Sequence, residues 1–307
     1  MVQSLASWFG GRGKLEAREE IAFHLFAAPW LIGFLVFTAY PTLASFFLSF
    51  THYEVITPAQ WIGLDNYLFV LHDPLFWQSL QVTALYAVGS VSLGVTFAFL
   101  LALLMNQPVP GISVYRTLYY LPSTISGVPV ALLWMWVFDP AFGVLNNVLK
   151  FFGIQGPQWL FSTTWVLPAF IIMSLWGVGG AMVIYLAGLQ GIPRHLYEAA
   201  ELDGATAVTR FRHVTIPMVS PVIFFNLILS IIGSFQTFTA AYVMTSGGPA
   251  NASLFYALYL YQNAFQFFKM GYASALAWVL LVIILALSMV VIQSSPYWVY
   301  YEGKLKG

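Results

Sequence analysis

Long apolar stretches alternate with short polar connections along nearly the whole chain. A helix needs roughly 20 apolar residues to cross a hydrocarbon layer about 30 Å thick. Six stretches reach that length, at about 22–50, 80–105, 116–138, 165–189, 216–237 and 271–294. Several contain glycine or proline, as in LPSTISGVPV and SLWGVGGAM, which membrane helices tolerate because neighbouring helices satisfy the freed backbone groups. The pattern predicts an all-α integral membrane protein with six transmembrane helices.

Composition and charge support this class. Of 307 residues, 60% are hydrophobic and only 7% are charged, and the mean hydropathy is +0.81, which lies outside the range of soluble domains. The 11 basic and 11 acidic residues cancel, so no net field attracts nucleic acid. The chain has no cysteine, and its five histidines lack metal-ligand spacing. We therefore expect membrane lipid as a partner, no nucleic acid and no metal site.

Lysine and arginine are distributed unevenly among the connections. Nine of the eleven lie before the first span, in the second and fourth connections, or after the last span, and the others are Lys150 and Lys269. The positive-inside rule then places both termini in the cytoplasm. The expected organisation is a cytoplasmic N-terminal segment at 1–21, a six-helix transmembrane domain at 22–294 that includes a cytoplasmic loop at 190–217, and a cytoplasmic tail at 295–307.

None of the charged residues falls well inside a proposed span. A proton-coupled carrier usually keeps an ionisable side chain at membrane depth, because the coupling ion needs a titrating partner. If transport is active, its energy would therefore come from outside this chain. A self-sufficient secondary carrier or channel for a small neutral polar solute stays open as the alternative.

The fourth connection concentrates charge in the segment GIPRHLYEAAELDGATAVTRFRHVTIP, residues 191–217. It predicts two short helices joined at a glycine. Pro193 suits a first helical turn, where its missing N–H is no loss, and Gly204 suits the left-handed residue that ends a helix. We expect the second helix to continue to Pro217, with Phe211 as its one large aromatic residue.

The first of these helices has two distinct faces. Arg194, Glu198 and Glu201 fall at i, i+4 and i+7 and form a polar stripe. Ala199 and Ala200 keep the other face low in profile, so another surface can approach the backbone closely. Periodicity alone leaves two roles open: a solvated connector, or a surface that docks another protein.

The fifth span carries a polar stripe that includes Asn226, Ser230 and Ser234, spaced four residues apart. Such groups are costly in lipid and are expected to face the bundle. Interhelical hydrogen bonds are one reading of the stripe, and a pathway for neutral polyols is the other. With candidate aromatic platforms added, the proposed substrate pathway comprises Trp176, Asn226, Ser230, Ser234, Gln236 and Tyr272.

The spacing of EAA at 198–200, Gly204 and VTIP at 214–217 resembles the EAA motif of permease subunits from bacterial binding-protein-dependent ABC importers. The segments YVMTSGGP, MGYASALAW and WVYYEG resemble the carbohydrate branch of that family. LSFTHYEV, WIGLDNY, YRTLYYLP and LLWMWVFDP extend the likeness over nearly the whole chain. Thr239 and Tyr297 depart from the family pattern, which often has an acidic and a basic residue there, and these departures leave the identity of the sugar open.

The resemblance implies the type I ABC importer permease fold in a bacterial cell membrane. It implies a non-enzymatic subunit that passes a carbohydrate, delivered by an extracytoplasmic binding protein, through an alternating-access pathway. The expected partners are a second homologous permease, as a heterodimer, and two ATP-binding subunits that hold ATP and magnesium, so this chain would bind no cofactor. The residues expected to couple to the ATP-binding subunit are Arg194, Glu198, Ala199, Ala200, Asp203, Gly204 and Phe211.

Overall fold

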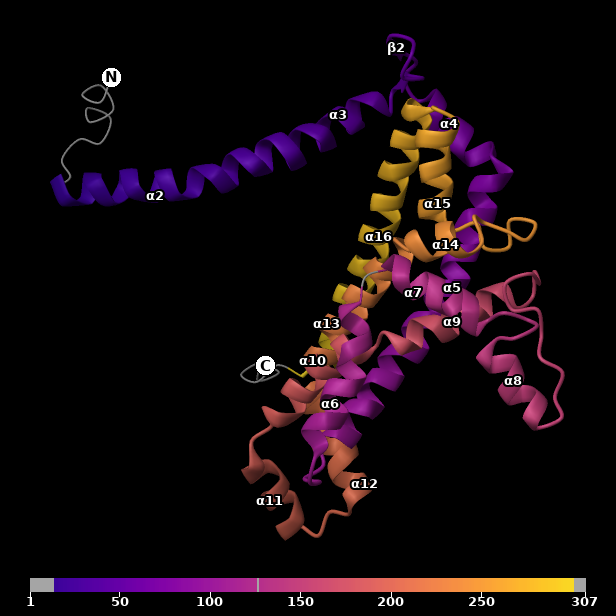
Figure 1. Cartoon of the computed structure of the whole chain (residues 1–307). Helices are drawn as coiled ribbons and strands as arrows, with labels where there is room; N and C mark the ends of the chain where they lie inside the picture. Colours follow the sequence, from indigo (N-terminus) through magenta and orange to yellow (C-terminus); the bar gives the residue numbers. More distant parts are fainter. Residues whose placement is uncertain (1–13, 126, 301–307) are drawn as a thin grey trace.

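A helical arm at the N-terminal end extends away from the rest of the molecule (Figure 1). The computed structural model describes residues 14–125 and 127–300, which are mostly helical. The arm, residues 14–48, comprises α2 (Lys14–Phe34), the π-helical turn η1 (Leu35–Ala39) and α3 (Tyr40–Leu48). No residue from 18 to 48 is buried. The arm joins the body where α3 packs against the C-terminal helix α16 (Met270–Trp298).

A small hairpin and a short helix begin the body. The hairpin pairs β1 (Thr51–His52) with β2 (Gln60–Trp61) in antiparallel register, and α4 (Asp65–His72) follows it. The long span α5 (Pro74–Met105) starts directly after Asp73. The Asp73 carboxylate accepts a hydrogen bond from the Leu75 N–H at 2.9 Å, and the proline at the first helical position needs no donor partner.

The predicted third and fourth spans are each two helices with a bend between them. The third consists of α6 (Ile112–Tyr120), the 3₁₀ turn η2 (Leu121–Thr124) and α7 (Gly127–Val137), with a bend of 103°. The fourth consists of α9 (Val166–Trp176) and α10 (Gly179–Gln190), with a bend of 48°. The connection between the two bent spans contains α8 (Val144–Phe151). Proline and glycine at these breaks interrupt the helical hydrogen bonding.

The predicted cytoplasmic loop contains α11 (Arg194–Leu202), whose following Gly204 has φ of +75°, as expected from its place at a helix end. After it, α12 (Ala207–Arg210), the π-helical turn η3 (Phe211–Thr215), α13 (Ile216–Phe235) and α14 (Thr239–Met244) form one span of 38 residues. The expectation that the second loop helix ends at Pro217 is therefore wrong. The wider π turn just before Pro217 makes room for the proline ring, so the helix continues.

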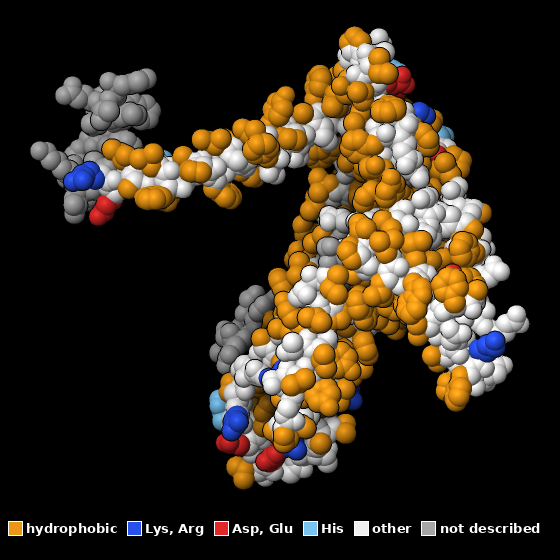
Figure 2. Space-filling view, viewed as in Figure 1, with side chains coloured by type: hydrophobic (Ala, Val, Ile, Leu, Met, Phe, Trp, Pro, Cys, Tyr) orange, Lys and Arg blue, Asp and Glu red, His pale blue; other side chains and the backbone are white. Residues whose placement is uncertain are grey.

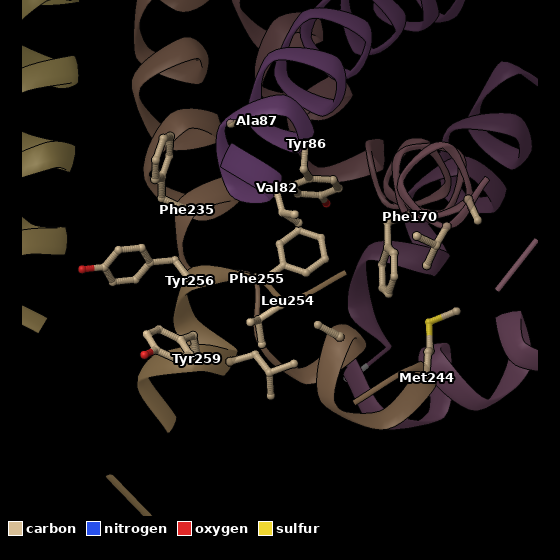
Figure 3. Packing of buried hydrophobic residues seen from close by; sticks show 14 of the residues in the cluster. Val82, Tyr86, Ala87, Phe170, Phe235, Met244, Leu254, Phe255, Tyr256 and Tyr259 are labelled. Carbon is tan, nitrogen blue, oxygen red and sulfur yellow. The ribbon is translucent and has the colours of Figure 1, made fainter. Parts of the chain in front are cut away.

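The chain then forms α15 (Tyr256–Tyr261) and the π-helical turn η4 (Gln262–Gln266) before α16. Buried side chains from α5, α7, α9, α13, α14, α15 and α16 contribute to the main apolar core, part of which is drawn in Figure 3. Within it, Phe255 stacks edge-on against both Tyr86 and Phe170. A second core, nearer the predicted cytoplasmic end, joins α5, α10 and the start of α13 around Met182, Tyr185 and Val219.

The described residues contain four helices long and apolar enough to cross a membrane, or six when each bent pair counts as one span. This confirms the expected all-α membrane architecture. Apolar side chains cover the arm and the middle of the body, whereas charged side chains gather toward the two ends of the body (Figure 2). Parts of the predicted terminal segments 1–21 and 295–307 lie outside the described residues.

Candidate translocation site and coupling loop

A cavity of about 240 Å³, lined by hydroxyl-bearing and small apolar residues, lies among α5, the bent span α9–α10, and α13. Among the described residues, no charged side chain lines it. Its wall carries the hydroxyl groups of Tyr86, Ser90, Ser174, Ser230, Ser234 and Thr237. Because these lining groups are neutral hydrogen-bond donors and acceptors, this cavity suits a neutral ligand with several hydroxyl groups.

Two of the predicted pathway residues meet at this cavity, and one lies just beside it. Ser230 and Ser234 both contribute to the wall, although the Ser234 hydroxyl also donates to the Ile231 carbonyl at 2.8 Å. Asn226 is buried one turn earlier on the same helix. Its side-chain amide donates to the Val222 carbonyl at 3.0 Å, so the amide stabilises the helix and is absent from the cavity wall.

The other three predicted pathway residues lie elsewhere. Trp176 lines a second, mainly apolar cavity of about 650 Å³ among α5, α6, α7 and α9, where its ring meets Trp134 edge-on with centroids 6.2 Å apart. Gln236 is exposed just after α13 ends. Tyr272 lies in the first turn of α16, at the hairpin end of the body, where its hydroxyl donates to Asp73 at 2.6 Å. The structure therefore does not bring these three side chains to the hydroxyl-lined cavity.

The breaks in three spans meet beside this cavity. Gly179, at the start of α10, lies against the Tyr119 carbonyl and the Tyr120 Cα, where any Cβ would collide. A Cβ at Gly127, at the start of α7, would lie 3.3 Å from a side-chain carbon of Thr239, at the start of α14. In membrane transporters, ligand sites are commonly built where helices are interrupted. The glycines therefore allow three broken spans to share one junction.

The coupling loop, residues 190–217, forms the end of the body opposite the hairpin (Figure 1). Arg194, Glu198 and Ala199 of α11 are exposed, and Ala200 is half-buried. The helix ends with the Ala205 N–H donating to the Ala200 carbonyl at 2.9 Å. This closure is typical of a helix that ends at a left-handed glycine. The predicted polar stripe is thus exposed, whereas the alanine face is exposed at Ala199 and half-buried at Ala200.

Two other predicted coupling residues have roles within the loop. Asp203 is the C-terminal capping residue of α11, and its N–H donates to the Ala199 carbonyl at 3.0 Å. The Phe211 ring packs nearly parallel to Phe99 of α5, with centroids 6.2 Å apart. Phe211 thus anchors the loop against the body, while the most exposed large apolar side chains on the loop are Leu202 (90% exposed) and Val208 (75%).

Sequence reasoning missed a buried carboxylate at the hairpin end of the body. Asp73 is only 8% exposed, and its second carboxylate oxygen accepts hydrogen bonds from the hydroxyls of Tyr259 and Tyr272. Burial raises the pKa of Tyr259 to about 12, so its hydroxyl keeps the proton that it donates. The Asp-Pro pair before an apolar run was the available signal, because it marks a helix start.

The sequence reading also missed an ion pair in the coupling loop. Arg210, at the end of α12, donates to the carboxylate of Glu201, near the end of α11. The pair spans the glycine turn and joins the two loop helices. Opposite charges nine residues apart carry no helical periodicity, so only the fold of the turn brings them together.

The broken apolar spans, the uncharged hydroxyl-lined cavity and the exposed helical loop define a multi-pass membrane transport protein. A family model described as "Binding-protein-dependent transport system inner membrane component" matches residues 94–295. A probable ABC transporter permease protein, YesP of Bacillus subtilis (strain 168), is 46% identical over 292 residues and covers 94% of both chains. The lactose transport system permease protein LacF of Rhizobium radiobacter is 37% identical and covers 90% of this chain and 95% of its own.

The fold has a solved counterpart as well. A chain in the crystal structure of a bacterial ABC transporter involved in the import of the acidic polysaccharide alginate superposes with a TM-score of 0.79, at 25% identity over 93% of this chain and 99% of that one. The chain therefore belongs to the inner membrane components of binding-protein-dependent transport systems, and it is an ABC importer permease. Both the predicted family and the type I permease fold are confirmed, and the self-sufficient carrier is not supported.

Proposed function

We propose that this permease imports a carbohydrate delivered by an extracytoplasmic binding protein. Relatives are named for sugar-containing cargo: LacF for lactose, and SmoG of Agrobacterium fabrum, 35% identical, for sulfoquinovosyl glycerol. The observation that carries the proposal is the cavity whose polar lining is hydroxyl-rich and uncharged. A neutral sugar needs hydrogen-bond donors and acceptors and no countercharge, whereas a charged amino acid or metal ion would need ionised groups.

A paired substitution in the cavity wall tests the substrate class. Changing Ser230 and Ser234 together to alanine removes two hydroxyls, each worth about 1 kcal/mol in a hydrogen bond, so the substrate concentration for half-maximal uptake should rise about 30-fold. Ser220→Ala is the control, because it removes a hydroxyl from the same helix outside the cavity. That hydroxyl accepts a hydrogen bond from the Tyr300 N–H. Unchanged uptake and selectivity in the double variant would place the pathway elsewhere.

The second part of the proposal is a heterodimer with a homologous permease. The arm supports it, because α2 and η1 hold large exposed apolar side chains, including Phe26, Trp30 and Phe37, and apolar side chains cover the arm in Figure 2. A neighbouring membrane chain would cover this surface and bury the apolar area that the single chain leaves open. Purification through a tag on this chain should therefore recover a second, different permease, and recovery of this chain as a single species would contradict the heterodimer.

The third part concerns energy. Two ATP-binding subunits would hold ATP and magnesium, and α11 would dock into a cleft of one of them, with the exposed Glu198 carboxylate accepting hydrogen bonds from it. The outward-facing charged stripe and low alanine face support this role. Closure of the ATP-binding subunits would then move the helix bundle between inward-open and outward-open states.

Charge reversal at the docking face tests the third part. Glu198→Arg should leave membrane insertion intact but reduce substrate-stimulated ATP hydrolysis at least tenfold, because a cation replaces the proposed acceptor. The same reversal at Glu19, exposed on the arm, is the matched control. Normal stimulation in Glu198→Arg would contradict docking, and uptake by the purified chain alone in liposomes without ATP would contradict the whole proposal.

A further inference from the structure

One unbroken stretch of helix joins the coupling loop to the hydroxyl-lined cavity. The span at 207–244 begins inside the loop with α12 and passes through η3 into α13. Ser230 and Ser234 in the cavity wall belong to this same span. From Arg210 to Ser234 the helix rises roughly 36 Å at about 1.5 Å per residue. A rotation of this helix near Arg210 would therefore also move Ser230 and Ser234 in the cavity wall.

The docking helix α11 contacts this long helix at two points. At its tip, Glu201 forms the ion pair with Arg210. Nearer its base, the hydroxyl of Tyr197 hydrogen-bonds the hydroxyl of Thr215 at 3.0 Å. Thr215 is buried at 6% exposure, whereas Arg210 lies closer to the surface. The two contacts therefore lie at opposite ends of the η3 turn.

Two separated contacts fix an angle that one contact would leave free. With only the Tyr197–Thr215 bond, α11 could pivot about its base, because the four residues between α11 and α12 include the conformationally permissive Gly204. The Glu201–Arg210 ion pair holds the other end of α11 and so prevents this rotation. A π-helical turn between the two contacts is a common feature of functional sites, and here it is held from both ends.

We propose that the Glu201–Arg210 and Tyr197–Thr215 contacts form a clasp that makes α11 turn as one body with the continuous helix 207–235. Glu201 and Arg210 are then positioning residues for coupling: they transmit the movement of the ATP-binding subunit to the cavity wall. The clasp rests on the proposed docking of α11. Its ion pair is partly exposed, with 59% of the Glu201 side chain and 28% of the Arg210 side chain accessible. A docked subunit would exclude water and strengthen the pair.

Charge reversal with rescue tests the clasp in the assembled transporter. Arg210→Glu places two carboxylates together, so stimulation of ATP hydrolysis by substrate-loaded binding protein should fall about tenfold. The exchange Glu201→Arg with Arg210→Glu restores opposite charges and should return stimulation to within about threefold of the parent. Arg212→Glu makes the same charge change two residues away, at an exposed position with no ion pair among the described residues, and should stay within twofold.

The angle itself can be measured because the chain has no cysteine. Spin labels on cysteines introduced at Leu202 and Val208 of the full chain should give a narrow distance distribution in the parent and a broad one in Arg210→Glu. The exchange variant should be narrow again. Stimulation within twofold of the parent in Arg210→Glu, or an exchange variant no better than the single variants in either measurement, overturns the clasp.

The clasp and the docking proposal fail in different ways. If Glu198→Arg abolishes stimulation while Arg210→Glu leaves it normal, α11 docks but the ion pair does not transmit movement, and only the clasp is wrong. If Glu198→Arg leaves stimulation normal, the docking proposal is wrong, whatever the spin labels show about the angle. If Arg210→Glu prevents assembly and the exchange restores it, the pair holds α11 in place, as the clasp requires.

Discussion

The two ends of the body are tied together by opposite means. At the hairpin end, the buried Asp73 carboxylate joins α5, α15 and α16 through Tyr259 and Tyr272. At the loop end, the partly exposed pair of Glu201 and Arg210 joins α11 to α12. Removing a buried acceptor is costly, because its buried donors are left without a hydrogen-bond partner. An exposed ion pair contributes little to stability by itself. We therefore expect the hairpin end to stay rigid, and the loop end to become rigid only when a partner subunit binds.

The same contrast appears in the surroundings of each contact. Beside Asp73, the side-chain amide of Asn66 donates to the carbonyls of Ser49 and Thr51, both at 2.9 Å, so the base of the arm is fixed to α4. Around the loop pair, no residue of α11 is buried. The hairpin end would hold the arm in place while the loop end moves with the ATP-binding subunits.

The largest expected effect comes from breaking the fixed end. Asp73→Ala should lower the free energy of unfolding by about 3 kcal/mol, because two buried phenol groups lose their acceptor and α5 loses its cap. Thermal unfolding in detergent would measure this. Asp65→Ala, at an exposed position in the first turn of α4, should shift the transition far less. Equal shifts in the two variants would show that burial does not distinguish this end.

The junction of the broken spans gives an intermediate case. Gly179→Ala should cost about 1–3 kcal/mol, because its new methyl group meets the backbone of Tyr119 and Tyr120 and the close-packed spans must move apart. Uptake should fall with stability, since the cavity wall includes the neighbouring Val178. Gly33→Ala in the arm, with open space around the new group, is the matched control and should be neutral or slightly stabilising. A Gly179→Ala variant as stable and active as the parent would contradict a tight junction.

The smallest expected effect is at the loop end. Glu201→Gln removes the ion pair but should change the unfolding free energy of the isolated chain by less than about 1 kcal/mol, because water screens the pair. The check is a comparison of melting temperatures at low and high salt, in which the parent should approach the variant as salt rises. A loss as large as that of Asp73→Ala would mean that the two ends are tied equally firmly.

The sequence by itself determined the class of the protein and much of its local structure. Span positions follow from runs of apolar residues, and the end of α11 at Gly204 follows from the conformational freedom of glycine. The serine stripe of the fifth span also predicted Ser230 and Ser234 at a common wall, because residues four apart share a helix face. These are properties of short segments, which neighbouring residues in the chain decide.

Only the tertiary structure decided which distant groups meet. Tyr272 pairs with Asp73 across 199 residues of chain, so its aromatic character could not reveal that it lies away from the cavity. The sharp bends of the third and fourth spans, likewise, depend on how Gly179 packs against Tyr119. Hydropathy reports how a residue prefers to be solvated, and it contains no information about which of many apolar neighbours will cover it. Contacts across the bundle are settled by the packing of whole helices, after the local pattern has placed each span in the membrane.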